Sequence, residues 1–310
     1  MIKKIKVFAP ATVANLGCGF DVMGMALEEV GDILEVSVSE GFGLQIYNES
    51  KVPLPENVEK NVITPAVLAF MDAWGRKMKV EIRVLQKIRP GSGIGSSAAS
   101  SSAAVYALNE LLDCPFTTRQ LIPFAMEGER IISGTAHADN VGPALLGGIV
   151  LVRSYEPLDV ISLPVPETFC CSVVHPHIVV STKEAREVLR KEIPLRDAVI
   201  QWGNVGGLVA GLALGDTGLV GRSMQDVIAE PYRKHFIPLY DELKKGLMSS
   251  GALAVNISGS GPSVFALSGS WQQAIRIGEL MQQHFNGLDI TADIYISRVG
   301  RKGTRVLDIE

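Results

Sequence analysis

The sequence lacks any apolar run long enough to cross a membrane, which would need about 18 consecutive apolar residues. The stretch GLVAGLALG at 207–215 is the nearest approach, and it is short and flanked by polar residues. Three lysines near the N-terminus precede VFAPATVA, but Pro10 and Thr12 interrupt this segment, so we expect a first β-strand rather than a signal peptide. These features predict a soluble, cytoplasmic protein without a membrane partner.

Cysteine is scarce and charge is nearly balanced. The four cysteines have no metal-ligand spacing and are expected to be free thiols of a reducing compartment. The formal net charge of −4 gives no basic surface for nucleic acid. No internal repeat or low-complexity linker is present. A length of 310 residues with 47% hydrophobic content predicts two domains, which we place at 1–165 and 166–310.

Apolar periodicity predicts a mixed α+β chain. Leu34, Val36 and Val38 alternate with polar residues, as do Val80, Ile82 and Val84, and both patterns indicate half-buried strands. Helical spacing predicts helices at 61–74, 118–132 and 271–285. Further strands are expected at 147–153 and at 290–297, where the last of them finishes the fold. LAVNISGSGPSVFAL (253–267) predicts two strands joined by a glycine turn.

A glycine-rich segment, RPGSGIGSSAASSSA (89–103), separates the expected strand at 79–86 from an apolar helix. Glycines let a backbone approach a ligand closely, and the unpaired N–H groups of a helix start attract anions, so the segment predicts a phosphate site. Its G-x-G-x-G spacing differs from the dinucleotide fingerprint, and no P-loop lysine follows. The alternative is a loop that only caps the helix.

Three stretches together resemble the signature motifs of the GHMP kinases: APATVANLGCGFDVMGMAL (9–27), PGSGIGSSAASSSA (90–103) and NISGSGPSVFAL (256–267). Within this superfamily the chain is most similar to the homoserine kinases. SGTAHADNVGPALLGG (133–148), STKEAR (181–186) and DVIAEPYR (226–233) support that similarity. The loop entry departs from it, because Pro90 comes one position later than usual and Ile94 replaces leucine.

The resemblance implies an N-terminal domain like the second domain of ribosomal protein S5 and a C-terminal α+β sandwich with a ferredoxin-like element. It also implies ATP between the domains, with its phosphates on the glycine loop. The implied ATP contacts are Asn61, Pro90, Gly91, Ser92, Gly93, Ile94, Gly95, Ser96, Ser97, Ala98 and Ala99. Asn61, with Val62, would line the adenine pocket, or else cap the helix at 61–74.

Ser97 and Glu129 match the Mg²⁺ ligands of the family, and oxygen ligands suit that ion. Read without the resemblance, Ser97 is an N-cap and Glu129 a solvated helix charge, and Glu127 could be mistaken for it. Asn140 is expected to orient the acceptor hydroxyl. Whether Asp139 takes the proton, or the phosphate does, stays open.

The implied substrate is L-homoserine, which carries a carboxylate, an ammonium group and a hydroxyl. Arginine binds carboxylates in a bidentate manner, so Arg186 and Arg233 are expected to hold the carboxylate and Asp21 the ammonium group. Ser181 and Glu184 have capping-box spacing, which predicts a helix start there. The full set of implied substrate contacts is Asn15, Asp21, His137, Thr182, Arg186, Arg233 and Gly259.

The resulting expectation is an ATP- and Mg²⁺-dependent kinase that forms O-phospho-L-homoserine, a step towards threonine. The alternatives are another small-molecule GHMP kinase, for mevalonate or a sugar, and a non-catalytic sensor on the same fold. The oligomeric state, with a homodimer among the choices, stays open. His175 and His177, in HPH, are interpreted as structural.

Overall fold

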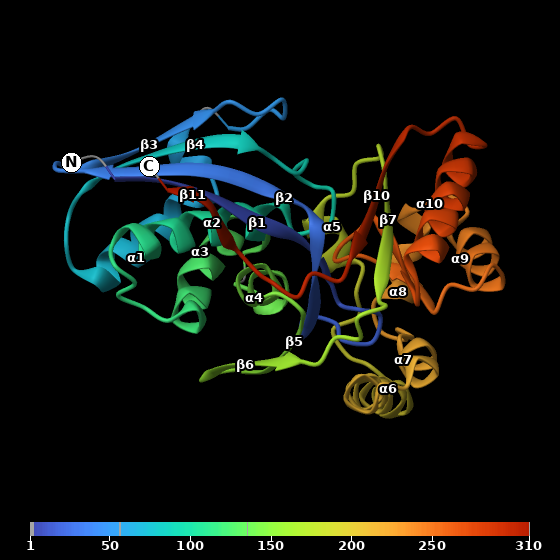
Figure 1. Ribbon diagram of the computed structural model, residues 1–310. Coiled ribbons are helices and arrows are strands. Elements are labelled where there is room, and N and C mark those ends of the chain that lie inside the picture. Colours follow the sequence, from blue (N-terminus) through green and yellow to red (C-terminus); the bar gives the residue numbers. More distant parts are fainter. Residues whose placement is uncertain (1–2, 56, 135, 310) are drawn as a thin grey trace.

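The computed structural model describes residues 3–55, 57–134 and 136–309 (Figure 1). The N-terminal part contains β1 (Lys3–Ala14), β2 (Met23–Ser39), β3 (Gly43–Asn48), η1 (Val58–Lys60), α1 (Ile63–Trp74), β4 (Lys79–Gln86), α2 (Ser96–Leu111), η2 (Thr118–Leu121), α3 (Ile122–Ser133), α4 (Ala138–Leu146), β5 (Ile149–Tyr155) and β6 (Leu158–Leu163). The C-terminal part contains β7 (Cys170–Pro176), α5 (Thr182–Glu187), α6 (Leu195–Leu214), α7 (Thr217–Ser223), α8 (Glu230–Arg233), η3 (Lys234–Phe236), α9 (Tyr240–Ser249), β8 (Ala254–Ile257), β9 (Val264–Ser268), α10 (Trp271–Asn286), β10 (Ala292–Arg298) and β11 (Arg305–Ile309).

A seven-stranded sheet organises the N-terminal part. Its main order is β11-β1-β2-β4-β3, and β5 extends it by pairing with β2 and β6. The alternating residues of 34–38 and 80–84 are buried, which confirms both predicted strands. Helices α1 to α4 lie together on one side of this sheet (Figure 1). The apolar face of the sheet is therefore covered, as a packed layer requires.

Helix α2 is the centre of that layer, and its Ser- and Ala-rich sequence follows from its position. Ser100, Ser101 and Ser102 are buried along with the alanines around them. Small side chains let β1, β2 and the neighbouring helices approach α2 from all sides. A Cβ on Gly128 of α3 would lie 2.0 Å from Ser101 Oγ, so α3 crosses α2 where neither residue has bulk.

The C-terminal part is built on a four-stranded sheet in the order β10-β7-β9-β8. Helices α9 and α10 cover its outer face (Figure 1), and a second apolar core forms there around Val174, Leu243, Met281 and Phe285. The predicted pair of strands within 253–267 is confirmed as β8 and β9. The glycine turn between them points back towards the N-terminal part, because Gly259 N–H donates to Ala14 O over 3.4 Å.

Two features differ from the sequence-based expectations. The chain does not finish with the strand near 290–297, because β11 returns to the first sheet and pairs antiparallel with β1. The helix expected at 118–132 is split into η2 and α3, with a capping box at Thr117 and Gln120. The predicted domain boundary near 165 lies in the connection between β6 and β7 and stays a prediction. No helix within the described residues is long and apolar enough to cross a membrane.

Phe70, Phe116 and Phe124 form a cluster of edge-to-face rings under the N-terminal sheet, with centroids 5.1–5.7 Å apart. Phe70 is fully buried. We expect Phe70→Ala to lower the free energy of unfolding by about 3–5 kcal/mol, because it removes buried surface and leaves a cavity. Urea denaturation measures this loss. Leu68→Ala, on the same helix at 52% exposure, should change stability by no more than about 0.5 kcal/mol. Equal losses in both variants would contradict the assigned core.

Candidate active site

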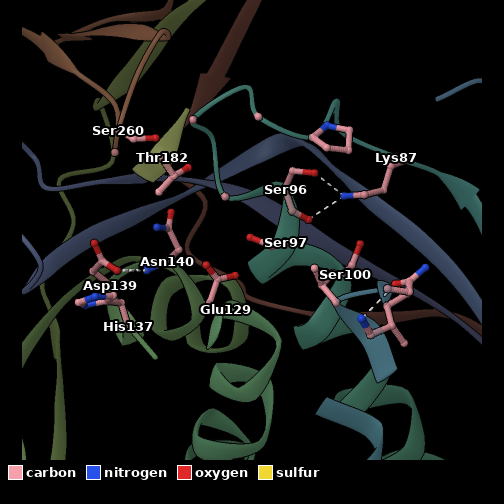
Figure 2. A pocket seen from close by; sticks show the side chains of 18 of the residues that line it. Lys87, Ser96, Ser97, Ser100, Glu129, His137, Asp139, Asn140, Thr182 and Ser260 are labelled. Atoms are coloured by element: carbon pink, nitrogen blue, oxygen red, sulfur yellow. Dashed lines mark hydrogen bonds between the residues drawn. The ribbon is translucent and has the colours of Figure 1, made fainter. Parts of the chain in front are cut away.

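A cavity of about 310 Å³ lies between the two parts of the chain, in the size range usual for small-molecule sites. Both parts contribute side chains that face into it, among them Ser97, Glu129, Asn140 and Thr182 (Figure 2). Most of the residues proposed from the sequence line this cavity. Four of the expected ATP contacts do not: Ser92, Ile94, Ala98 and Ala99 are buried outside it.

The glycine loop presents its N–H groups to the cavity because its carbonyl groups are bound on the other side. Ser92 O accepts a hydrogen bond from Ser263 Oγ, Gly93 O accepts one from Ser258 Oγ at 2.7 Å, and Ile94 O accepts one from Thr12 N–H at 3.1 Å. Within the described chain, no backbone carbonyl accepts from the N–H groups of Gly93, Ile94 or Gly95. Such a run of open donors at a helix start binds anions.

Packing requires that Gly93 and Gly95 have no side chain, in addition to any requirement of a ligand. Gly93 has φ +79°, and a Cβ there would lie 2.7 Å from Gly261 O. A Cβ on Gly95 would lie 1.9 Å from Thr12 Oγ1. A side chain at Gly93 would therefore push against the β8–β9 turn as well as enter the space above the loop.

A buried ion pair joins the two ends of the glycine loop. Lys87 Nζ lies 2.9 Å from Asp32 Oδ2, and the two side chains are 3% and 0% exposed. Lys87 also donates to Ser96 at the start of α2 (Figure 2), and Ser100 Oγ donates to Asp32 at 2.6 Å. The loop is thus anchored before and after its glycines. Lys87 was missed in the sequence because it precedes the loop, whereas a P-loop lysine follows it.

Ser97 and Glu129 are brought together at the floor of the cavity (Figure 2). Burial raises the pKa of the Glu129 carboxyl, while the hydrogen bond from Ser97 and the charge of Lys87 lower it, and the balance stays above the ordinary value. Ser97 is not the N-cap of α2, because Gly95 occupies that position in a left-handed conformation. Glu127, by contrast, forms an exposed ion pair with Arg130 at 3.0 Å.

Asn140 has a fixed orientation. Its Oδ1 accepts a hydrogen bond from the buried hydroxyl of Thr12 at 2.7 Å. With this oxygen occupied, the NH₂ group of Asn140 is the part available to the cavity, so Asn140 is a hydrogen-bond donor there. Thr12 was not proposed from the sequence, and no local pattern connects it to a residue 128 positions away.

Asp139 precedes Asn140 and is buried, at 4% exposure. Burial, followed by the nearby charges of Asp21 and Glu129, raises the pKa of Asp139 to about 8. Its Oδ1 accepts from the Asn140 N–H at 3.1 Å (Figure 2). Asp139 is therefore mostly protonated at pH 7 and is a poor acceptor for a proton in that state.

On the far side of the cavity, Arg186 forms a bidentate pair with Asp21, with N–O distances of 3.1 and 3.2 Å. His137 Nε2 lies 3.2 Å from the same guanidinium group. Burial lowers the pKa of His137, so this imidazole is neutral at pH 7. The sequence assigned Arg186 to a carboxylate and Asp21 to an ammonium group, and here the two side chains neutralise each other.

Arg233 differs from Arg186 because no carboxylate among the described residues forms an ion pair with it. It is 5% exposed, and it donates to two backbone carbonyls, Ala185 O at 2.9 Å and Gly259 O at 2.9 Å. Burial lowers the pKa of this guanidinium, although Asp21 opposes that effect. Asn15 Nδ2 also donates to Gly259 O at 3.1 Å. The cavity thus contains a fixed positive charge with unused donor capacity.

The remaining expected contacts, Thr182 and Asn61, also line the cavity. Thr182 begins α5, and Ser181 caps that helix by accepting from the Glu184 N–H, as the spacing predicted. Asn61 lines the cavity, and its Oδ1 accepts from the Ile63 N–H at the start of α1, although the N-cap position itself is Val62. Cavity residues not anticipated from the sequence are Leu54, Pro55, Lys60, Ile63, Lys87, Ser100 and Ser260.

Comparison with known proteins agrees with this geometry. The family of GHMP kinases N terminal domains matches residues 61–148, and that of GHMP kinases C terminal domains matches 208–287. Homoserine kinase of Chloroherpeton thalassium is 44% identical, over 99% of this chain and 100% of that protein. This chain belongs to the GHMP kinases and, within them, to the homoserine kinases.

Solved structures place the chain in the same family. The crystal structure of homoserine kinase from Cytophaga hutchinsonii has a TM-score of 0.93 and 50% identity, covering 98% of this chain and 97% of that one. Mevalonate kinase of L. major, in complex with R-mevalonate, has a TM-score of 0.70 at 18% identity, covering 95% and 96%. The latter shows the shared fold alone.

Because the folded-state pKa of Asp139 lies above its ordinary value of 3.8, the native state holds a proton that the unfolded chain loses. The resulting stability is complete below about pH 4 and is lost as pH rises towards 8. We expect the free energy of unfolding of the wild type, relative to Asp139→Asn, to fall by up to about 1.4 kcal/mol per pH unit between about pH 5 and 7. Urea unfolding across this range measures the slope. A flat difference would show that Asp139 is ionised in the folded protein.

Proposed function

We propose that this chain transfers the γ-phosphoryl group of ATP to the side-chain hydroxyl of L-homoserine, which yields ADP and O-phospho-L-homoserine on the route to threonine. The observation that carries the proposal is the charge pattern opposite the glycine loop. An Arg186–Asp21 pair and the carboxylate-free Arg233 face one cavity with an open anion site. One end of that cavity suits a triphosphate and the other suits a zwitterion.

When homoserine binds, its two charged groups replace the contact between Arg186 and Asp21. The ammonium group of homoserine takes an oxygen of Asp21, and its carboxylate takes the guanidinium groups of Arg186 and Arg233, so no charge in the site is left uncompensated. Both arginines lie against the Phe20 ring, with centroid distances of 5.9 and 5.1 Å. The ring face thus attracts both guanidinium groups to the same side of the cavity.

ATP places its phosphates on the open N–H groups of the glycine loop and the first turn of α2. The contacts are with the loop backbone and with Ser96 and Ser97, which line the cavity. Ser92, Ile94, Ala98 and Ala99 support this surface from behind, since they are buried outside the cavity. Asn61 also lines the cavity, and in this proposal it contacts the adenine.

The residues present fit Mg²⁺. Ser97 and Glu129 offer a hydroxyl and a carboxylate that are hydrogen-bonded to each other, and hard oxygen ligands of this kind are those that Mg²⁺ prefers. When bound, the ion neutralises negative charge on the β and γ phosphates. The protein's own contribution is to keep a carboxylate at a buried position where it is poorly solvated.

Asn140 orients the acceptor. Its NH₂ group donates to the homoserine hydroxyl oxygen or to a transferring phosphate oxygen, because Thr12 holds its carbonyl oxygen. Since Asp139 is protonated at pH 7, the phosphate is the proton acceptor in this proposal. Positioning and electrostatic stabilisation then account for most of the rate enhancement.

Phosphorylation of mevalonate or a sugar is less consistent with the cavity, because neither acceptor has an ammonium group for Asp21. A non-catalytic sensor would not need a carboxylate as deeply placed as that of Glu129, whose burial raises its pKa.

Glu129→Gln tests the proposed Mg²⁺ site. Removing the charge should lower kcat and raise the half-saturating Mg²⁺ concentration by about tenfold or more, which corresponds to at least about 1.4 kcal/mol of ion binding. The midpoint of thermal unfolding should not fall, because burial already disfavours the charge. Glu127→Gln, which removes an exposed charge two residues away on the other side of the same helix, is the matched control and should titrate like the wild type.

A coupling between substrate groups and side chains tests the substrate. Arg233→Leu should weaken homoserine by roughly 30-fold to several-thousand-fold, from a loss of about 2–5 kcal/mol, and leave ATP affinity unchanged. Arg190→Leu, an exposed arginine stacked on Tyr232, is the control for arginine loss near α8.

The ammonium group is tested with 4-hydroxybutyrate, which lacks it. The wild type should prefer homoserine strongly, and Asp21→Asn should reduce that preference, measured as the ratio of kcat/KM values, by about tenfold or more. General damage to the fold lowers both rates and leaves the ratio unchanged. If the wild type used 4-hydroxybutyrate or mevalonate as well as homoserine, the substrate assignment would be wrong.

A further inference from the structure

Three potential metal ligands meet on the C-terminal sheet, outside the cavity described above. His175 is in β7, His177 follows the end of that strand, and Asp293 is the residue of β10 paired with His175. One ligand atom from each lies within 4.8 Å of the other two. Among the described residues, this is the one group of three or more His, Cys, Asp or Glu side chains with such spacing.

The distances suit a small cation. Asp293 Oδ2 lies 3.0 Å from His177 Nε2 and 3.6 Å from His175 Nδ1. Two ligand atoms of a tetrahedral Zn²⁺ are separated by roughly 3.3–3.5 Å when each bond is about 2.0–2.1 Å long. To bind the ion, Asp293 Oδ2 and His177 Nε2 must move slightly apart, and the ligand nitrogens of the two histidines must move closer together. The side chains of His177 and Asp293 are 29% and 39% exposed, which leaves them room to turn.

The surroundings prepare both imidazoles for a metal. His175 is 3% exposed, and its buried Nδ1 has no hydrogen-bond partner. His177 Nδ1 lies 3.0 Å from Thr291 Oγ1, a contact of the kind that orients a metal-bound imidazole from its other nitrogen.

We propose that His175, His177 and Asp293 form a binding site for a divalent transition-metal ion, with open positions for water. Two imidazoles and one carboxylate favour Zn²⁺, Ni²⁺ or Cu²⁺ over Mg²⁺. The ion joins the edge strand β10 to β7 on the sheet face shared with Cys171 and Val173, opposite α10. Arg89 lies near enough to influence both His175 and Asp293, and its charge opposes the cation. The site is therefore expected to be of moderate affinity.

The experiment uses the full chain without an affinity tag and without nucleotide, treated with a chelator and then titrated with Zn²⁺ by calorimetry. The wild type should bind one ion per chain, and its thermal unfolding midpoint should rise with Zn²⁺. His177→Ala and Asp293→Asn should each weaken binding by about 100-fold or more, whereas Thr291→Val should weaken it by about tenfold. His177 and Asp293 are preferred to the buried His175 because their removal leaves no cavity.

His235→Ala is the matched control, since His235 is an exposed histidine stacked on Phe236 outside the cluster. It should bind Zn²⁺ like the wild type. The proposal is overturned if the wild type shows no saturable binding, or if binding persists unchanged in both His177→Ala and Asp293→Asn. It is also overturned if the ion survives those changes but is lost in His137→Ala, because the metal would then lie beside Asp21 in the substrate cavity.

Discussion

The buried pair between Lys87 and Asp32 is the constraint on which the active site depends. Both charges are almost fully withdrawn from water, and neither would be tolerated there alone. Asp32 belongs to β2, Lys87 follows β4, and their partners Ser96 and Ser100 begin α2. One ion pair therefore fixes a strand of the sheet, the entry of the glycine loop and the start of the helix relative to one another. Because its two ends cannot move apart, the loop keeps a defined conformation although it contains three glycines.

The second constraint comes from the other half of the chain. Ser258 and Ser263, on either side of the β8–β9 turn, hold the carbonyl groups of Gly93 and Ser92. The same turn presents Gly259 O to Arg233 and Asn15. A single short turn thus supports the glycine loop on one side and Arg233 on the other. Relative motion of the two parts would disturb both together, so under the proposed function one piece of backbone would keep phosphate and acceptor in register.

Local patterns in the sequence predicted the local features of the fold. Alternation identified β2 and β4, glycine spacing identified the loop, and the Ser181–Glu184 spacing identified the start of α5. What the sequence could not predict are contacts between distant positions. β11 pairs with β1 across the whole chain, Thr12 holds Asn140, and Asp21 and Arg186 meet as a pair. Two residues assigned to different substrate groups gave no indication that they also bind each other, because a charge pattern does not specify its partner in the folded chain.

The packing of α2 also changes what its sequence signifies. Ser100, Ser101 and Ser102 are buried against neighbouring elements, and any larger residue there would force α2 away from the sheet or from α3. Part of the signature string is therefore an architectural requirement that is independent of phosphoryl transfer. A descendant of this chain that had lost its chemistry would still retain that string in order to fold. The first residues to be substituted after such a loss would be those at the cavity floor that packing does not require, and Glu129 is the main example. Active enzymes among related chains should therefore be recognised by these residues rather than by the glycine- and serine-rich string.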